Sequence, residues 1–205
     1  MTDWITLIEK VRSIAQIGGA YTKDPYDKER YDDLTSVAHE MYSNISNSEI
    51  AEIEDFFIPE KGYATAKVDL RGGIFKEGKI LLVRETRDGR WALPGGWADV
   101  GETPTEGVAR EVKEETGFNI EVTRLTAIRD QSIGGYKPRY PVHVYKLFFL
   151  CSITGGEACP STETSEIKFF SLSDLPELSV GTTLERDILA LQQADQDQSS
   201  LVSVD

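Results

Sequence analysis

Apolar residues recur every three or four positions in the first part of the chain. Over 4–15 this spacing predicts an amphipathic helix, which the glycine pair at 18–19 is expected to end. A second apolar stripe runs over 25–45, and Asp24 stands where a helix-capping residue belongs. A capping box then opens a third stripe over 46–57. The first quarter of the chain is therefore expected to be a small helical domain.

After Tyr63 the pattern changes to short runs rich in β-forming residues, separated by turn signals. Thr182 with Glu185 predicts a last helix that reaches about Gln193. The strands are expected over 64–75, 79–84, 119–130, 140–153 and 166–172. With the helices between and after them, these runs predict an α/β domain.

Three segments follow from this pattern. Residues 1–58 form the helical N-terminal domain, residues 63–195 form the α/β domain, and the polar residues 196–205 are expected to be a flexible tail. A length of 205 residues is enough for a buried core without disulfides. Cys151 and Cys159 match no metal or redox spacing, which is typical of free thiols in a reducing cytosol.

The net charge of the chain limits the classes of partner that we expect. The formal net charge of −13 argues against long nucleic acid, because binding to it rests on Lys and Arg. Most of the 35 acidic residues must be solvated surface, but an acidic protein also suits the recruitment of metal cations. The N-terminus is acidic where a signal peptide is basic, and no apolar run approaches the roughly 18 residues of a membrane span. We therefore expect a cytoplasmic protein that binds no membrane.

The helix predicted from Pro104 has the clearest boundaries in the chain. Thr103 fits the N-cap, Pro104 the first turn, Glu106 the closing position of a capping box and Gly117 the position just past the end. At about 100° per residue, its apolar positions gather on one side and its glutamates on another. The apolar side is expected to pack on the sheet.

The glutamates of this helix are Glu111, Glu114 and Glu115. Like charges at this spacing repel, so a compensating cation is expected. Hard divalent ions such as Mg²⁺ or Mn²⁺ prefer oxygen ligands, and a carbonyl of the Gly95-Gly96 turn could complete the set. Glutamate-rich helix faces are also common as solvated surface. The nearby glycines, Glu102 and Arg110 favour the metal site.

Residues 96–118 read GWADVGETPTEGVAREVKEETGF, and this stretch resembles the Nudix box at every defining position. The resemblance implies a Nudix α/β/α sandwich with a mixed sheet, preceded here by the small all-α domain. It also implies a hydrolase of pyrophosphate bonds that releases a nucleoside monophosphate and a phosphorylated product. Arg110 would orient the glutamates together with Glu102. The metal ligands would be Gly96 through its carbonyl, Glu111, Glu114 and Glu115.

Water attack also needs a base, which in many Nudix enzymes lies outside the box, on a loop before a late strand. Glu163 and Glu166 occupy the matching region, and the alternative for both is an ordinary solvated glutamate. If neither acts, Glu111 remains as the base.

Substrate contacts are expected on cationic and aromatic side chains near the box. Each arginine is either a phosphate ligand or a surface residue, Trp97 either stacks a base or fills the core, and Tyr136 lies in a loop that is expected to line the pocket. The candidates are Arg71, Arg84, Trp97, Arg129 and Tyr136.

The N-terminal stretch IAQIGGAYTKDPYDKERYDDL looks like that of a bacterial subgroup of Nudix hydrolases with a short helical domain, which implies a homodimer. Members are described as CDP-choline or ADP-ribose pyrophosphatases. We expect a small nucleoside diphosphate substrate, with CDP-choline first and ADP-ribose next. A dinucleoside polyphosphate hydrolase, an RNA-end hydrolase and a non-catalytic nucleotide sensor are the remaining alternatives.

Overall fold

The computed structural model describes residues 4–46, 62–137 and 142–205. The chain divides into two compact units. The helical unit comprises Met1–Ala66 with Tyr140–His143, and the sheet unit comprises Lys67–Arg139 with Val144–Asp205. No helix among the described residues is both long enough and apolar enough to cross a membrane.

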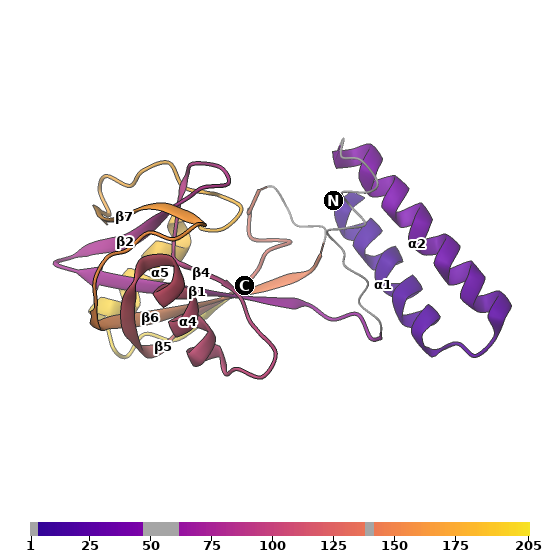
Figure 1. Ribbon diagram of the computed structural model, residues 1–205, viewed down its shortest axis with the longest axis horizontal. Coiled ribbons are helices and arrows are strands. Elements are labelled where there is room, and N and C mark those ends of the chain that lie inside the picture. Colours follow the sequence, from indigo (N-terminus) through magenta and orange to yellow (C-terminus); the bar gives the residue numbers. More distant parts are fainter. Residues whose placement is uncertain (1–3, 47–61, 138–141) are drawn as a thin grey trace. The chain divides into compact units, whose positions relative to one another are not determined.

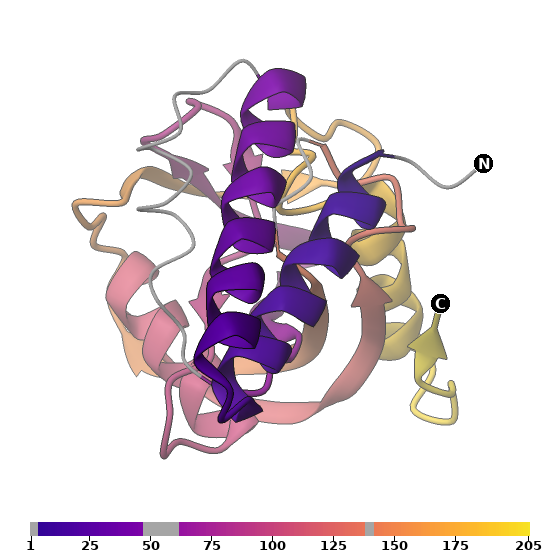
Figure 2. The ribbon, with the colours of Figure 1, turned by 90° about the vertical axis from the view of Figure 1, so that its right-hand side faces the viewer.

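The helical unit is built on two helices, α1 (Trp4–Tyr21) and α2 (Pro25–Ser46), which lie side by side as a hairpin (Figures 1 and 2). Ile8, Ala38 and Tyr42 form the buried centre between them. Asp24 caps the second helix as expected, because its Oδ1 accepts the backbone N–H groups of the next turn at 2.8 and 3.1 Å.

The glycine pair at 18–19 does not end the first helix, which continues to Tyr21. A Cβ atom on Gly18 would come within 2.3 Å of the ring of Tyr31 on α2. The glycine therefore lets the two helices approach closely, and the prediction of a stop was wrong. The third helix expected over 46–57 lies outside the described residues.

The sheet unit contains a mixed sheet in which the described residues form eight strands. Their order is β3-β2-β1-β6-β5-β8, with β4 paired to β1 and β7 to β2, and the β1–β6 and β5–β8 pairs are parallel. The elements in chain order are β1 (Lys67–Lys76), β2 (Lys79–Glu85), β3 (Trp91–Ala92), β4 (Gly95–Trp97), α4 (Pro104–Thr116), β5 (Phe118–Asp130), β6 (Val144–Gly156), β7 (Thr164–Ser171), α5 (Glu185–Gln196) and β8 (Ser203–Val204).

The two helices of this unit cover opposite faces of the sheet. Successive residues of a strand point to opposite faces, and alternate residues of β6 pack against different helices. Phe149 and Cys151 pack in one cluster with Val108 and Val112 of α4. Their neighbours Phe148 and Leu150 join the other cluster, which includes Ile188 and Leu191 of α5. The expected α/β/α sandwich with a mixed sheet is therefore confirmed.

Two predictions about the end of the chain were wrong. Helix α5 begins at Glu185, two residues later than a cap at Thr182 requires, because the carboxylate of Asp187 accepts the N–H of Leu184 at 2.9 Å. The residues expected to be a flexible tail add β8 to the sheet, in parallel with β5. Arg124 holds the segment before this strand by donating to four backbone carbonyls.

Candidate active site

Helix α4 begins and ends where its sequence predicts. The N–H of Thr103 donates to Glu106 Oε2 at 2.8 Å, the N–H of Glu106 donates to Thr103 Oγ1 at 3.3 Å, and Gly117 takes a left-handed conformation with φ 76°. Val108 and Val112 are buried against the sheet. The register of the remaining helix residues is thereby fixed, and the glutamates face the turn between β3 and β4.

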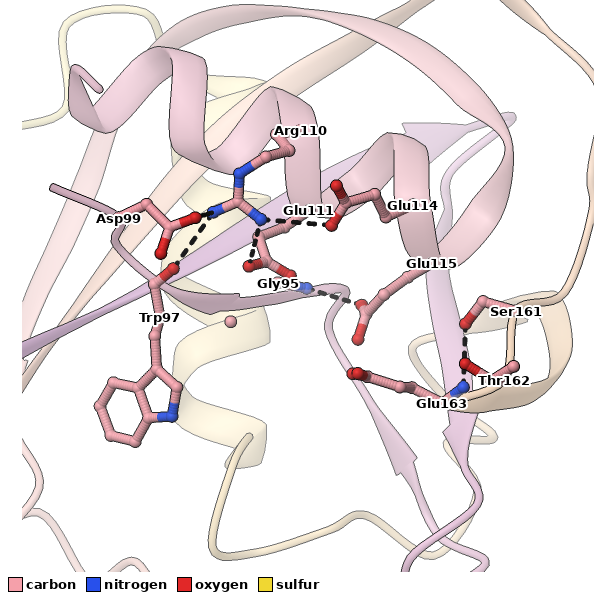
Figure 3. A pocket seen from close by; sticks show the side chains of 11 residues that line it. Gly95, Trp97, Asp99, Arg110, Glu111, Glu114, Glu115, Ser161, Thr162 and Glu163 are labelled. Atoms are coloured by element: carbon pink, nitrogen blue, oxygen red, sulfur yellow. Dashed lines mark hydrogen bonds and ion pairs between the residues drawn. The ribbon is translucent and has the colours of Figure 1, made fainter. Parts of the chain in front are cut away.

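Arg110 connects the acidic side chains of this region (Figure 3). It donates to both oxygens of Glu102 at 3.0 and 2.9 Å, to Glu111 at 2.8 Å and to Glu114 at 3.2 Å. Hydrogen bonds from Arg110 lower the pKa of Glu102 to about 2. The arginine therefore holds the three carboxylates in one arrangement.

Glu115 is almost buried and is held from the β4 side. Its Oε2 accepts the N–H of Gly95 at 2.8 Å, and its backbone carbonyl accepts the hydroxyl of Thr164 at 2.7 Å. Burial raises the pKa of Glu115 to about 7, although the charge of Arg71 and the Gly95 hydrogen bond act in the opposite direction. A negative charge at this position is therefore costly without a nearby cation.

Glu111 lies directly against Gly96. A Cβ atom at position 96 would come within 2.7 Å of Glu111 Oε2, so a side chain there would displace the carboxylate. Burial raises the pKa of Glu111 as well, an effect that its contact with Arg110 partly offsets. The glycine thus brings backbone and carboxylate oxygens together on one wall.

A cavity of about 480 Å³ opens between α4, the β4 turn and the loop before β7 (Figure 3). Of the side chains around it, five are carboxylates and one is a guanidinium. It is lined by Gly95, Gly96, Trp97, Asp99, Arg110, Glu111, Glu114, Glu115, Ser161, Thr162 and Glu163. This excess of negative charge suits cations or a cation-bound substrate.

The structure separates the two glutamates proposed as the base. Glu163 lines the cavity, where its carboxylate points toward that of Glu115 (Figure 3), while its carbonyl is held by the N–H and hydroxyl of Thr86. Glu166 lies outside the cavity lining, on β7, where it pairs with Arg84 at 2.7 Å and with Lys168. Of these two glutamates, only Glu163 therefore lies with Glu111, Glu114 and Glu115 around the cavity.

The sequence-predicted substrate arginines are all engaged away from the cavity lining. Arg71 is 7% exposed and binds Asp69 and the carbonyl of Leu93. Arg84 bonds the carbonyl of Gly89 and pairs with Glu166. Both interactions are internal to the sheet, and the structure provides no support for phosphate contacts by either residue.

Arg129 and Tyr136 both contact Asp187, and neither lines the cavity. The hydroxyl of Tyr136 donates to Asp187 at 2.8 Å, and Arg129 Nε lies 3.5 Å from the other oxygen of the same carboxylate. Tyr136 is 1% exposed, so it does not line an open pocket as expected from its loop position. Trp97, by contrast, is 40% exposed and lines the cavity, where a base could stack.

Some residues of the site were missed at the sequence level. Asp99 lines the cavity, lies 3.6 Å from Arg110 and donates its N–H to Glu102 at 2.8 Å. Asp69 and Lys146, which are partners on the neighbouring strands β1 and β6, pair at 2.9 Å behind the cavity lining. Charged residues within otherwise apolar strands were the available signal, because such residues are rarely buried unless paired.

The donor set fits a hard divalent cation, since it consists of glutamate oxygens beside a glycine backbone. Within residues 4–46, 62–137 and 142–205, no three acidic, histidine or cysteine side chains are grouped as a ready-made metal set. Glu111 is turned to Arg110 and Glu115 to the N–H of Gly95. Small side-chain rotations would have to accompany metal binding.

Family models match both units. The model for the NUDIX domain covers residues 72–192, and the model for a UDP-X-like N-terminal oligomerisation domain covers residues 2–57. The chain belongs to the Nudix family. The resemblance carried by residues 96–118 is therefore confirmed, together with the subgroup that has a helical N-terminal domain.

Individual relatives extend over most of the chain. The Bacillus subtilis (strain 168) protein YjhB, provisionally named an ADP-ribose pyrophosphatase, is 43% identical over 87% of this chain and 85% of its own. The structure of an ADP-ribose pyrophosphatase from Streptococcus suis 89-1591 is 42% identical with a TM-score of 0.63, over 69% of this chain and all of that one. A UDP-X diphosphatase structure is 33% identical with a TM-score of 0.64, over 99% and 98% of the two chains.

This Nudix protein is accordingly a pyrophosphohydrolase, an enzyme that acts on phosphoric anhydride bonds. Nudix hydrolases generally require a divalent metal, which agrees with the acidic cavity. Its N-terminal part belongs to a domain type described by its role in oligomerisation.

Proposed function

We propose that this Nudix hydrolase cleaves a nucleoside diphosphate linked to a second moiety, with Mg²⁺ or Mn²⁺, into a nucleoside monophosphate and a phosphorylated product. ADP-ribose is the first substrate of the proposal. The observation that carries it is the cavity in which Glu111, Glu115 and Glu163 converge beside Gly96. A diphosphate is the ligand that such a cavity would bind through shared cations.

The proposed role of each residue follows from its position around the cavity. Gly96, Glu111, Glu114 and Glu115 would hold the metal, which when bound would neutralise charge on the diphosphate and lower the pKa of a coordinated water. Glu163 enters from the opposite wall and would accept the proton of the attacking water. Arg110 would keep Glu102, Glu111 and Glu114 in place, as it does in the structure.

Two observations support the nucleotide part of the proposal. Trp97 is among the residues that line the cavity and is 40% exposed, and aromatic faces stack on bases. Relatives similar over most of this chain are named for ADP-ribose or UDP-linked substrates. These names support ADP-ribose as the first candidate of the proposal, and CDP-choline, which the sequence favoured, is the second.

We further propose that the enzyme works as a homodimer through its N-terminal helices. The helical unit exposes large apolar side chains, and its family model is described as an oligomerisation domain. Trp4, Ile14 and Val37 are each at least half exposed, which favours a further apolar contact in solution. Sedimentation equilibrium of the full chain would give the mass that decides this part of the proposal.

The test is a substrate panel with product identification at saturating Mg²⁺ and, separately, Mn²⁺. It compares kcat/KM for ADP-ribose, a UDP-sugar, CDP-choline, a dinucleoside polyphosphate and a 5′-triphosphorylated RNA. We expect AMP and ribose 5-phosphate from ADP-ribose as the fastest reaction. A tenfold preference for CDP-choline, with CMP and phosphocholine as products, would reverse the order of the first two substrates.

Glu115→Gln in the same assay tests the metal assignment. Loss of this carboxylate is expected to lower kcat/KM by a factor on the order of 10² or more, because several kcal/mol of charge stabilisation depend on the metal. Glu121→Gln, at an exposed position of β5, is the matched control and should behave as wild type. Tight nucleotide binding without turnover of any panel member would instead identify a sensor.

A further inference from the structure

Three charged side chains are buried together on β1, which pairs with β4, and on the neighbouring strand β6. Arg71 donates to Asp69 through Nε at 2.6 Å and through Nη2 at 2.9 Å, and Lys146 Nζ donates to the same carboxylate at 2.9 Å. All three are less than 10% exposed. Burial alone would raise the pKa of Asp69, but the two cations hold it below its ordinary value. This buried triad is therefore a fixed ionic unit.

The remaining contact of Arg71 leads to the active site. Its Nη1 donates to the carbonyl of Leu93 at 3.1 Å, two residues before the Gly95-Gly96 pair. Arg71 is also the direct antiparallel partner of Gly95 in the β1–β4 ladder. The N–H of Gly95 donates to Glu115, so Gly95 connects the triad to a proposed metal ligand.

Packing alone does not account for three buried charges. Replacing a buried ion pair by apolar residues of similar volume is often neutral or stabilising, so an ionic triad is weak evidence for stability. Its geometry is directional, however: the planar guanidinium joins Asp69 on one side to a specific carbonyl on the other. Such a unit can fix the position of a turn.

We propose that Arg71 is a positioning residue, which together with Asp69 and Lys146 sets Gly95 and Gly96 of β4 against α4 so that Gly96, Glu111 and Glu115 converge on the metal. The inference rests on the metal site of the proposed function. It replaces the expectation that Arg71 contacts substrate phosphate. In metal sites generally, replacing a residue that orients a metal ligand lowers metal affinity or activity about 10- to 100-fold.

Arg71→Met is the principal test, because it leaves the Asp69–Lys146 pair intact. We expect Mn²⁺ affinity of the substrate-free protein, measured by electron paramagnetic resonance, to fall about tenfold. We expect kcat to fall by a similar factor while KM for the nucleotide changes little. Loss of a positive charge near the carboxylates would by itself tighten cation binding, so weaker binding identifies displaced ligands.

Two further variants separate position from charge and from stability. Arg71→Lys keeps the charge but loses the forked hydrogen bonds, and it should be impaired nearly as much as Arg71→Met. Arg129→Met is the matched control, since Arg129 is equally buried and also pairs with an aspartate, but its partners lie on α5 and β8. It should lose stability and keep wild-type Mn²⁺ affinity and kcat.

The outcomes are distinct. Wild-type or tighter Mn²⁺ binding with unchanged kcat in Arg71→Met would overturn the inference, and so would an equal loss in Arg129→Met. If Arg71→Met does not fold by circular dichroism, Lys146→Met replaces it and should shift Mn²⁺ affinity and kcat in the same direction. Absence of Mn²⁺ binding and turnover in the wild-type protein would remove the proposed function itself, and the inference with it.

Discussion

The sheet unit contains two clusters of arginines and carboxylates that differ in charge balance and in access. The cavity cluster has Arg110 among Asp99, Glu111, Glu114, Glu115 and Glu163, and it lines a cavity of about 480 Å³. The Asp187 cluster has Arg129 and Arg186 beside Asp187 and Asp205, with the hydroxyl of Tyr136 bonded to Asp187, and none of these residues lines that cavity. The cavity cluster has five acidic side chains and one basic side chain, and the other cluster has two of each.

The difference distinguishes the proposed active site from a cluster to which no catalytic role is assigned. Both clusters perturb the pKa of a carboxyl group by burial, since Glu115 and Asp187 are both raised. A perturbed pKa therefore does not distinguish them. An excess of negative charge beside an open cavity does distinguish them. Only that combination leaves space for an added cation and makes its binding favourable.

The largest expected effect concerns the base. Glu163→Gln should lower kcat by a factor on the order of 10² or more at saturating Mg²⁺, because general bases contribute 10²- to 10⁴-fold. Glu166→Gln should retain wild-type kcat, since Glu166 pairs with Arg84 and Lys168 outside the cavity lining. Equal losses in steady-state assays of the two variants would show that the cavity does not define the catalytic set.

A smaller effect is expected in the Asp187 cluster. Tyr136→Phe removes the hydrogen bond to the buried carboxylate of Asp187 and should lower the free energy of unfolding by about 2 kcal/mol, the usual size for a hydrogen bond to a charged group. Urea denaturation gives this value. KM should stay at the wild-type value, whereas a clear rise in KM would restore Tyr136 as a substrate residue.

The smallest effect is a pH dependence of opposite sign at two aspartates. The folded-state pKa of Asp69 is lowered, so its stabilisation is present above the ordinary value of 3.8 and is lost as pH falls through the folded-state pKa. That of Asp187 is raised, so its contribution is present below 3.8 and is lost as pH rises through the folded-state pKa. Both directions follow from proton linkage.

Denaturation of wild type, Asp69→Asn and Asp187→Asn between pH 3 and 6 measures these contributions. The stability gap between wild type and Asp69→Asn should narrow toward pH 3. The gap between wild type and Asp187→Asn should widen over the same interval. Parallel pH curves for the three proteins would mean that neither carboxyl group is perturbed by folding.

The features that were predictable from sequence are those specified by neighbouring residues. Helix α4 was placed correctly because Thr103, Glu106 and Gly117 specify its ends within the helix itself. The β1–β2 hairpin is similar, since Glu77 and Gly78 both adopt the positive φ that a two-residue turn requires. These contacts span few residues, so their sequence spacing is informative.

The roles of the arginines were not predictable, because their partners are distant in sequence. Arg71 meets the carbonyl of Leu93, and Arg84 meets Glu166 across the β2–β7 pair. Arg129 pairs with Asp187, a residue that no sequence pattern singled out and that lies in the first turn of α5 in the structure. Spacing along the chain contains no information about which strands become neighbours, and thus none about which charges pair.

The local definition of α4 also sets the order in which the site can assemble. The capping box and the glycine stop act within one short segment, so the glutamates acquire their helical spacing on the fast timescale of helix formation. The facing wall depends on β2 pairing with β7, strands about 80 residues apart, and such non-local pairing is slow. During refolding, a chain that has regained its helices will therefore still lack the two-sided cavity of the proposed active site.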